Sequence, residues 1–259
     1  MSIHLPNLRG AWGVYALAPP DIGNRVFWWN AAGTAGGSFS DQAATVPAAN
    51  NVRVGSIKGA EGNKFTQTVV TDQPLFLLNR QNALPGLYFQ RSRIDHLEDP
   101  PAGFLTALQG LDAFTIMVVW HPTVQDACAL SFRDNSDDGI FMGTGNANQL
   151  VAYRRGNMSA GNQVDITDAD NFGKASAAIL TFPGFSATMG LYDNHGNSDT
   201  AATDSADGGA WDNARIGAKT NLADGWEGDI YEIIIWDEAA DGTQRTAAFA
   251  YATSKWGLT

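Results

Sequence analysis

The sequence predicts an all-β fold, a sandwich or barrel of antiparallel strands. Glycine (28 residues) and proline (10 residues) interrupt the 259-residue chain at short intervals, and the segments between them are brief and apolar. This spacing is typical of all-β sandwiches and barrels rather than of alternating strands and helices. Apolar types make up 44% of the residues, which is ample for a buried core and excludes wholesale disorder.

The clearest strand is predicted at Ala113–Trp120, followed by His121 and Pro122. Side chains alternate between the two faces of a strand, and here both faces are apolar. We therefore expect this strand to lie centrally, covered on both sides. Further strands are predicted at Leu75–Leu78, Leu87–Gln90, Ala129–Phe132, Gly139–Met142, Leu150–Arg154, Ala177–Phe182, Thr188–Tyr192, Ala214–Ile216 and Asp229–Trp236.

One helix is predicted at the C-terminal end of the chain. Asp241 or Thr243 can accept a hydrogen bond from the first turn as its N-cap. Gly257 stands just past the expected end, where a left-handed backbone is needed. Three apolar residues recur on one face and should pack on the sandwich: Phe249, Ala252 and Trp256.

The first 50 residues have a different character from the rest. They are rich in Ala and Gly, contain Trp12, Trp28 and Trp29, and show strand alternation only near Val26–Trp29. We interpret residues 1–50 as an N-terminal arm or accessory layer of the same domain, and residues 51–259 as the sandwich.

Charge and cysteine content exclude several classes of function. The chain has 27 acidic and 16 basic residues, a net charge of −11, which disfavours binding to nucleic acid or to an anionic membrane surface. The single Cys128 forms no internal disulfide, and its apolar neighbours indicate a buried hydrophobe. No stretch is apolar enough to span a membrane. The N-terminus lacks the pattern of a signal peptide, so we expect synthesis in the cytosol without secretory export.

Three stretches of the sequence resemble a known family. They are Thr71–Asn79 with Leu84–Phe89, where a Leu-Pro-Gly turn is expected to lead into the next strand, then Leu111–Trp120, and finally Trp226–Asp237 with Tyr251–Gly257. Together they resemble the concanavalin A-like lectin and glucanase domain, in the laminin-G-like form common in bacterial and bacteriophage proteins. The resemblance spans about residues 52–257. It implies a two-sheet antiparallel jelly-roll sandwich with a short C-terminal helix, a fold that carries lectins, enzymes and structural modules alike.

An acidic strand near the C-terminus offers a catalytic hypothesis. The run Glu227-Gly-Asp229-Ile-Tyr-Glu232 is similar to the strand on which glucanases of this family carry their nucleophile and acid/base. Retaining chemistry needs the two carboxyls about 5 to 5.5 Å apart. In a regular strand Glu227, Asp229, Tyr231, Ile233 and Ile235 share one face and Glu232 lies on the other, and no Gly or Pro suggests a bulge. We therefore favour a structural strand, with a retaining glycosidase using Glu227 and Glu232 as the alternative.

Two polar segments are candidate ligand sites. Asp134, Ser136 and Asp138 have the alternating oxygen ligands of a loose calcium site, although the same residues also suit an ordinary hairpin turn. The polar loop expected from Tyr192 to Asn213 carries the amides, carboxylates and flat ring that a sugar needs, in Asp193, Asn194, Trp211, Asp212 and Asn213. The alternative is a solvated loop with Trp211 folded onto the core.

A lectin-like fold without a secretion signal suggests a protein released by lysis. The resemblance implies a non-enzymatic structural protein of a tailed-bacteriophage virion, such as a head decoration, head-fibre or tail-fibre module. Its expected place is the virion surface, and its expected partners are other virion proteins, its own copies and host-surface carbohydrate. No cofactor is expected apart from the calcium considered above. The alternatives are the glycosidase and a stand-alone carbohydrate-binding module.

Overall fold

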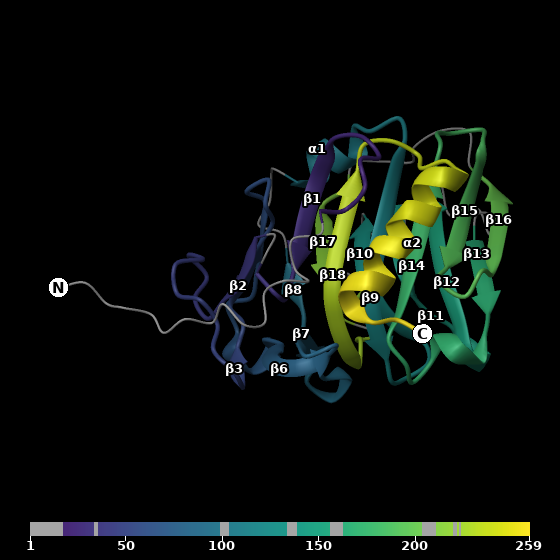
Figure 1. The fold of residues 1–259 in the computed structure, drawn as a ribbon. Coiled ribbons are helices and arrows are strands. Elements are labelled where there is room, and N and C mark those ends of the chain that lie inside the picture. The colour runs from purple at the N-terminus through teal and green to yellow at the C-terminus, as the bar shows by residue number, and fades with distance from the viewer. Residues whose placement is uncertain are drawn as a thin grey trace.

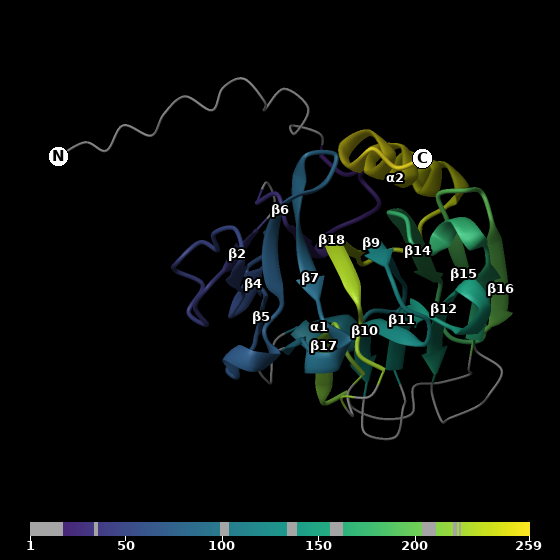
Figure 2. The ribbon, with the colours of Figure 1, turned by 90° about the horizontal axis from the view of Figure 1, so that it is seen from below.

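Two antiparallel nine-stranded sheets, named A and B, face each other in the computed structural model, and one long helix lies outside sheet A (Figures 1 and 2). The structure describes residues 18–33, 36–98, 104–133, 139–155, 163–203, 211–219, 222 and 224–259. The predicted two-sheet sandwich with a C-terminal helix is confirmed. All ten predicted strands are present, with ends that differ by a few residues.

Sheet A contains the central strand that the sequence predicts. Across the sheet the order is β16 (Ser198–Ala202), β15 (Thr188–Asp193), β14 (Ser176–Phe182), β9 (Phe114–Pro122), β18 (Gly228–Trp236), β7 (Leu84–Phe89), β6 (Leu75–Gln81) and β3 (Val52–Arg53), and β1 (Arg25–Asn30) also pairs with β18. Strand β9 lies between β14 and β18 and is buried on both faces, as predicted.

Sheet B forms the opposite layer of the sandwich. Its order is β13 (Gln163–Thr167), β12 (Gln149–Arg155), β11 (Gly139–Thr144), β10 (Ala127–Arg133), β17 (Asn213–Ile216), β8 (Leu97–Glu98), β5 (Lys64–Thr66), β4 (Ser56–Lys58) and β2 (Gly37–Phe39). Most of the strands that the sequence does not predict are here. They are short strands of two to five residues, which carry little periodic signal.

The described part of the first 50 residues belongs to both sheets. Strand β1 pairs with β18 from Arg25↔Trp236 to Asn30↔Glu232, and β2 pairs with β4. The boundary expected after residue 50 therefore falls within the sheets. Residues 1–17, which include Trp12, lie outside the described residues.

Two apolar clusters flank sheet A. The first fills the space between the sheets and includes Phe114, Ile116, Val118 and Trp120 of β9. The short helix α1 (Phe104–Gln109) packs into this cluster, and the sequence does not predict it. The second lies between sheet A and the long helix α2 (Gly242–Trp256), and includes Met117 and Val119 of the same strand.

Helix α2 has the ends that the sequence predicts. Asp241 is the N-cap, and its carboxylate accepts from the main-chain N–H of Gln244 while the Gln244 side chain accepts from the main-chain N–H of Asp241. Gly257 ends the helix with φ 62°. Ala252 and Trp256 are buried against the sheet, as predicted, and Phe249 packs at the edge of the same cluster.

The Leu-Pro-Gly run does not form the predicted turn. Leu84–Phe89 is strand β7, and the connection from β6 is made by Asn82 and Ala83, whose φ values are 49° and 58°. Gly86 instead allows close packing, because a Cβ there would come within 2.8 Å of the Tyr231 ring.

Short 3₁₀ turns complete the described elements: η2 (Val70–Asp72), η3 (Arg91–Arg93), η4 (Asn146–Asn148) and η5 (Ala169–Asn171). Within the described ranges, none of the helices has the length and apolar character needed to cross a bilayer.

Candidate functional site

The acidic strand β18 contains a bulge that the sequence does not reveal. Opposite β9 the pairing passes from Ile230↔Trp120 directly to Glu232↔Val119, so Tyr231 is the extra residue. Beyond it the side chains change faces. Ile233 and Ile235 join the core between the sheets, and Glu232 lies beneath α2 on the same face as Tyr231. The predicted face assignment therefore holds up to Tyr231 and is wrong from Glu232 onward, because the bulge reverses the alternation.

Glu232 is fully buried and holds four hydrogen-bond donors. Its Oε1 accepts from Trp28 Nε1 (2.8 Å), Tyr251 OH (2.7 Å) and Lys255 Nζ (2.9 Å), and its Oε2 accepts from Trp256 Nε1 (2.6 Å). These donors come from β1 and α2. The carboxylate thus ties the first strand and the last helix to sheet A.

The buried donors around Glu232 have perturbed protonation equilibria. Burial lowers the pKa of the Lys255 ammonium below its ordinary value, although the neighbouring carboxylate of Glu232 acts in the opposite direction. Burial, followed by the charge of Glu232, raises the pKa of the Tyr251 hydroxyl. The Glu232–Lys255 pair is an internal ion pair of the kind that is destabilising to break.

The other two carboxylates of the motif also serve the fold. Asp229 receives Arg80 in a two-pronged pair, with Nε at 3.0 Å and Nη2 at 2.8 Å. Glu227 is half-buried and accepts from the main-chain N–H of Arg91 at 3.3 Å. Because Glu232 has no exposed surface, it cannot contact a glycoside, and this geometry does not support a retaining pair of Glu227 and Glu232.

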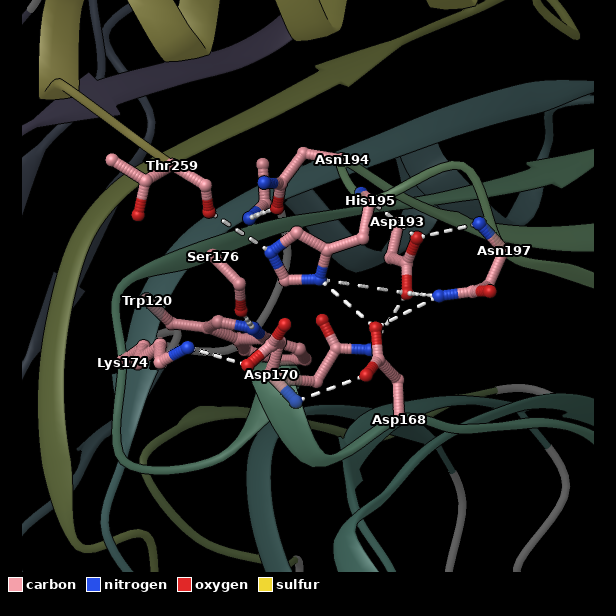
Figure 3. A network of polar contacts seen from close by, with 12 residues as sticks. Trp120, Asp168, Asp170, Lys174, Ser176, Asp193, Asn194, His195, Asn197 and Thr259 are labelled. Carbon is pink, nitrogen blue, oxygen red and sulfur yellow. Dashed lines mark hydrogen bonds and ion pairs between the residues drawn. The ribbon is translucent and has the colours of Figure 1, made fainter.

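Two of the predicted sugar-binding residues belong to a dense polar cluster at the turn between β15 and β16 (Figure 3). The Asp193 side chain is fully buried and accepts from Asn171 Nδ2 (2.7 Å), Asn197 Nδ2 (3.0 Å) and the main-chain N–H groups of His195 and Asn197. The Asn194 Oδ1 accepts from the main-chain N–H of Ala177 at 2.7 Å. Both side chains are therefore engaged within the protein.

A shallow depression of about 290 Å³ lies beside this turn and α2. Its aromatic residues are Tyr192 and Phe249, and the Arg245 guanidinium sits 3.9 Å from the Tyr192 ring centroid. The ring face that could stack on a sugar is therefore covered from that side.

The remaining three predicted sugar ligands lie elsewhere. Trp211 is 6% exposed and belongs to the core between the sheets, as the alternative interpretation holds. Asp212 is exposed and Asn213 begins β17 in sheet B, opposite Arg133. The segment expected to be one polar loop also contains the edge strand β16, so the five residues do not form one site.

The candidate calcium ligands Asp134, Ser136 and Asp138 lie outside the described residues, although β10 and β11 do pair as a hairpin.

The outer face of sheet B holds a larger depression that the sequence does not predict. Its volume is about 360 Å³, within the usual range for small-ligand sites. It lies over β10, β11 and β12, whose outward side chains are set by strand alternation. The lining residues are Asp126, Arg133, Phe141, Thr144, Gly145, Asn146, Gln149, Val151, Tyr153, Gln163, Lys219 and Asp224.

The floor of this depression consists of two stacked aromatic rings, with two cationic side chains beside them. Phe141 and Tyr153 stack with centroids 4.8 Å apart and planes 6° apart, and Arg133 Nη1 lies 3.2 Å from Tyr153 OH. Lys219 Nζ is 5.5 Å from the Phe141 ring centroid and pairs with Asp224. These contacts fix the floor of the depression.

Several polar groups at the rim have no internal partner. Among the described residues, the side chains of Asp126, Asn146, Gln149 and Gln163 have no hydrogen-bond partner, and all are at least partly exposed. Carboxylates and amides with free lone pairs and N–H groups can bind ligand hydroxyls. This contrasts with the β15–β16 turn, where the polar atoms already pair with each other.

Cys128 lies beneath this face in a small cluster with Phe141, Val151 and Tyr153. It is fully buried, and burial raises the pKa of its thiol to about 12. The interpretation of Cys128 as a buried hydrophobe agrees with this position.

Comparison with known proteins gives only distant similarity. No family model matches the chain, and no curated protein sequence matches it. A solved structure of the Ruminococcus gnavus IT-sialidase CBM40 bound to α2,3-sialyllactose has a TM-score of 0.48 and 15% identity, covering 58% of this chain and 87% of that one. The K499G mutant of the NanB sialidase from Streptococcus pneumoniae has a TM-score of 0.44 and 12% identity, covering 62% and 27%. At these values the similarity does not extend to a ligand or an activity.

Proposed function

We propose that this chain is a non-enzymatic structural protein of a tailed-bacteriophage virion, and that the outer face of its sheet B binds a host-surface glycan. The observation that carries the binding proposal is the depression of about 360 Å³ over β10–β12, with unpaired amides and a carboxylate at its rim. The opposite outer face, on sheet A, is covered by α2. Sheet B is thus the layer whose outer face is not covered by α2.

The chemistry of the depression suits a carbohydrate. Sugar hydroxyls both donate and accept hydrogen bonds, and Gln149 and Gln163 can do the same through their amides. Phe141, Val151 and Tyr153 are 5%, 8% and 7% exposed and contribute only small apolar edges to the lining, so hydrogen bonds to the rim carry the proposed recognition. The lining carries two cations, Arg133 and Lys219, and two carboxylates, Asp126 and Asp224, so neutral and acidic sugars are both tested.

The virion assignment rests on the laminin-G-like resemblance and on composition. An acidic chain with few charges, one cysteine and many Gly residues suits a β-rich surface protein of a particle. In this proposal the neighbouring virion proteins and further copies of the chain are its assembly partners, and the sandwich faces outward.

A glycan screen tests the binding proposal. The full chain is applied to an array of neutral and sialylated glycans, and the best binder is then titrated calorimetrically. We expect Gln149→Ala and Lys219→Met each to weaken binding by about tenfold, as when one hydrogen bond of roughly 1.4 kcal/mol is lost.

Matched variants far from the depression provide the control. Gln42→Ala and Lys58→Met remove the same side-chain types at exposed positions outside the lining residues. They should leave the affinity unchanged. Equal losses in all four variants, or no binding to any glycan, would contradict the proposed site.

Assembly is tested separately by light scattering and by sedimentation with purified phage particles. The proposal predicts that the chain self-associates or co-sediments with virions. A stable monomer without affinity for particles would remove the virion assignment, while leaving a stand-alone carbohydrate-binding module.

A further inference from the structure

The geometry points to a binding site for a divalent transition-metal ion, Zn²⁺ being the best fit, at Asp168, Asp193 and His195. One ligand atom from each residue lies within 4.8 Å of the others. Ligands 2.0–2.2 Å from a common ion fall within such a separation. Figure 3 shows the imidazole and the two carboxylates converging at the turn between β15 and β16.

Both ring nitrogens of His195 face oxygen acceptors. Its Nε2 lies 3.2 Å from the main-chain oxygen of Thr259, which can only accept, so Nε2 carries a proton. Its Nδ1 lies 3.1 Å from Asp168 Oδ2 and 4.0 Å from Asp193 Oδ2. In the neutral tautomer the Nδ1 lone pair therefore points at two carboxylates, an arrangement that a cation between them stabilises. The Nε2–H bond to Thr259 is also the outer contact that typically orients a metal-binding histidine.

A second, independent observation comes from Asn171. This side chain is fully buried, its Nδ2 donates to Asp193 Oδ2 at 2.7 Å, and its Oδ1 has no hydrogen-bond partner. A buried acceptor without a partner is unusual and needs an explanation. Because Nδ2 makes the 2.7 Å bond, this Oδ1 faces away from Asp193, and a cation would satisfy it only after a 180° turn of the amide that gives up that bond.

The side-chain amide of Asn197 bridges the Asp168 and Asp193 carboxylates, at the position that the proposed ion would take. Its Nδ2 donates to Asp168 Oδ2 (2.8 Å) and to Asp193 Oδ2 (3.0 Å). Metal binding would require this amide to give up both bonds. The two N–H bonds thus occupy the position of the cation in the metal-free arrangement.

The backbone holds these groups in place from two connections. Asp168 follows β13, and its Oδ1 accepts from the main-chain N–H of Asp170 at 2.9 Å. Asp193 ends β15, and its Oδ1 accepts the main-chain N–H groups of His195 and Asn197. The Asp199 carboxylate of β16 accepts the main-chain N–H of Asp165 in β13 at 2.9 Å, which joins the two sheets beside the site.

The ligand set selects the kind of ion. Calcium and magnesium prefer oxygen ligands alone, whereas imidazole with carboxylates suits Zn²⁺ and its neighbours. The site therefore differs in place and in chemistry from the calcium loop considered in the sequence analysis.

Zinc binding by the full chain is the test. After removal of metals with a chelator, we expect calorimetry to give one Zn²⁺ per chain, with Ca²⁺ binding far more weakly. His195→Gln and Asp168→Asn should each lower the zinc affinity by at least about tenfold. His121→Gln removes another partly exposed histidine and should leave it unchanged. Circular dichroism checks that each variant folds.

A measurement on the unmodified chain keeps the test decisive should a variant fail to fold. Zinc should shift the ¹⁵N resonance of His195 Nδ1 and not that of His121. Absence of zinc binding, or a zinc affinity of His195→Gln and Asp168→Asn equal to that of the wild type, would overturn the proposal.

Discussion

Glu232 shows how a single buried carboxylate can organise a fold. Four donors from β1 and α2 converge on it, and the bulge at Tyr231 turns it to the face beneath the helix. The same residue in a regular strand would point into the core between the sheets, where no donor of α2 could reach it. A motif that resembles a catalytic strand in sequence is therefore a structural anchor in space.

Glu232→Gln should destabilise the protein strongly. The change removes the charge that offsets buried Lys255 and replaces an accepting oxygen by an N–H₂ group that faces donors. We expect the free energy of unfolding to fall by about 3 kcal/mol or more, measured by chemical denaturation.

Glu227→Gln is the matched comparison for that change. The amide oxygen can still accept from the main-chain N–H of Arg91, so the stability should change by no more than about 0.5 kcal/mol. Similar stability of the two variants would show that Glu232 is not the anchor described above.

The buried carboxyl of Asp95 should make the stability of the protein depend on pH. Burial raises its pKa from 3.8 to about 6, although the main-chain N–H of Gln90 and the charge of Arg93 act in the opposite direction. The folded state thus favours the protonated carboxyl. Its contribution to stability is complete below about pH 4 and is lost as the pH rises through about 6.

The comparison of wild type with Asp95→Asn isolates this group. From pH 4 to pH 7 the free energy of unfolding of the wild type should fall relative to the variant by about 2 to 3 kcal/mol. Urea unfolding at a series of pH values measures the difference. A constant difference across this range would mean that Asp95 titrates normally.

At the scale of elements, local signals in the sequence predict the long elements and miss the short ones. Strand β9 is foreseen because both of its faces are apolar, and α2 because Asp241 and Gly257 mark its ends. The bulge in β18 carries no local signal, since Ile230-Tyr231 suits a regular strand equally well. Strand β16 is missed because Ser198–Ala202 lacks an apolar alternation.

The ends of α2 offer a prediction at this scale. Asp241→Ala removes one half of the capping box and should lower stability by about 1 kcal/mol. Gly257→Ala places a Cβ on a residue with φ 62° and should lower it by a similar amount. Thermal unfolding measures both changes, and Gly242→Ala, in the first turn, is the control without a left-handed backbone. Equal melting temperatures for all variants would contradict the assigned caps.

At the scale of the whole molecule, the two sheets differ in what covers their outer faces. Helix α2 closes sheet A (Figure 2), and on sheet B the depression over β10–β12 opens to the outside. The sequence predicts the sandwich but not this site, because Arg133, Gln149 and Lys219 are far apart in the chain and carry no joint motif. Trp211, the aromatic residue that the sequence offers for stacking on a sugar, lies in the core between the sheets instead.

A co-crystal structure with the best-binding glycan of the array tests the central claim most directly. We predict that the sugar lies on the outer face of sheet B, within hydrogen-bond distance of Gln149 or Gln163 and over the Phe141–Tyr153 pair. A sugar bound beside Tyr192 and Arg245 at the β15–β16 turn, or anywhere on the sheet A side, would contradict it.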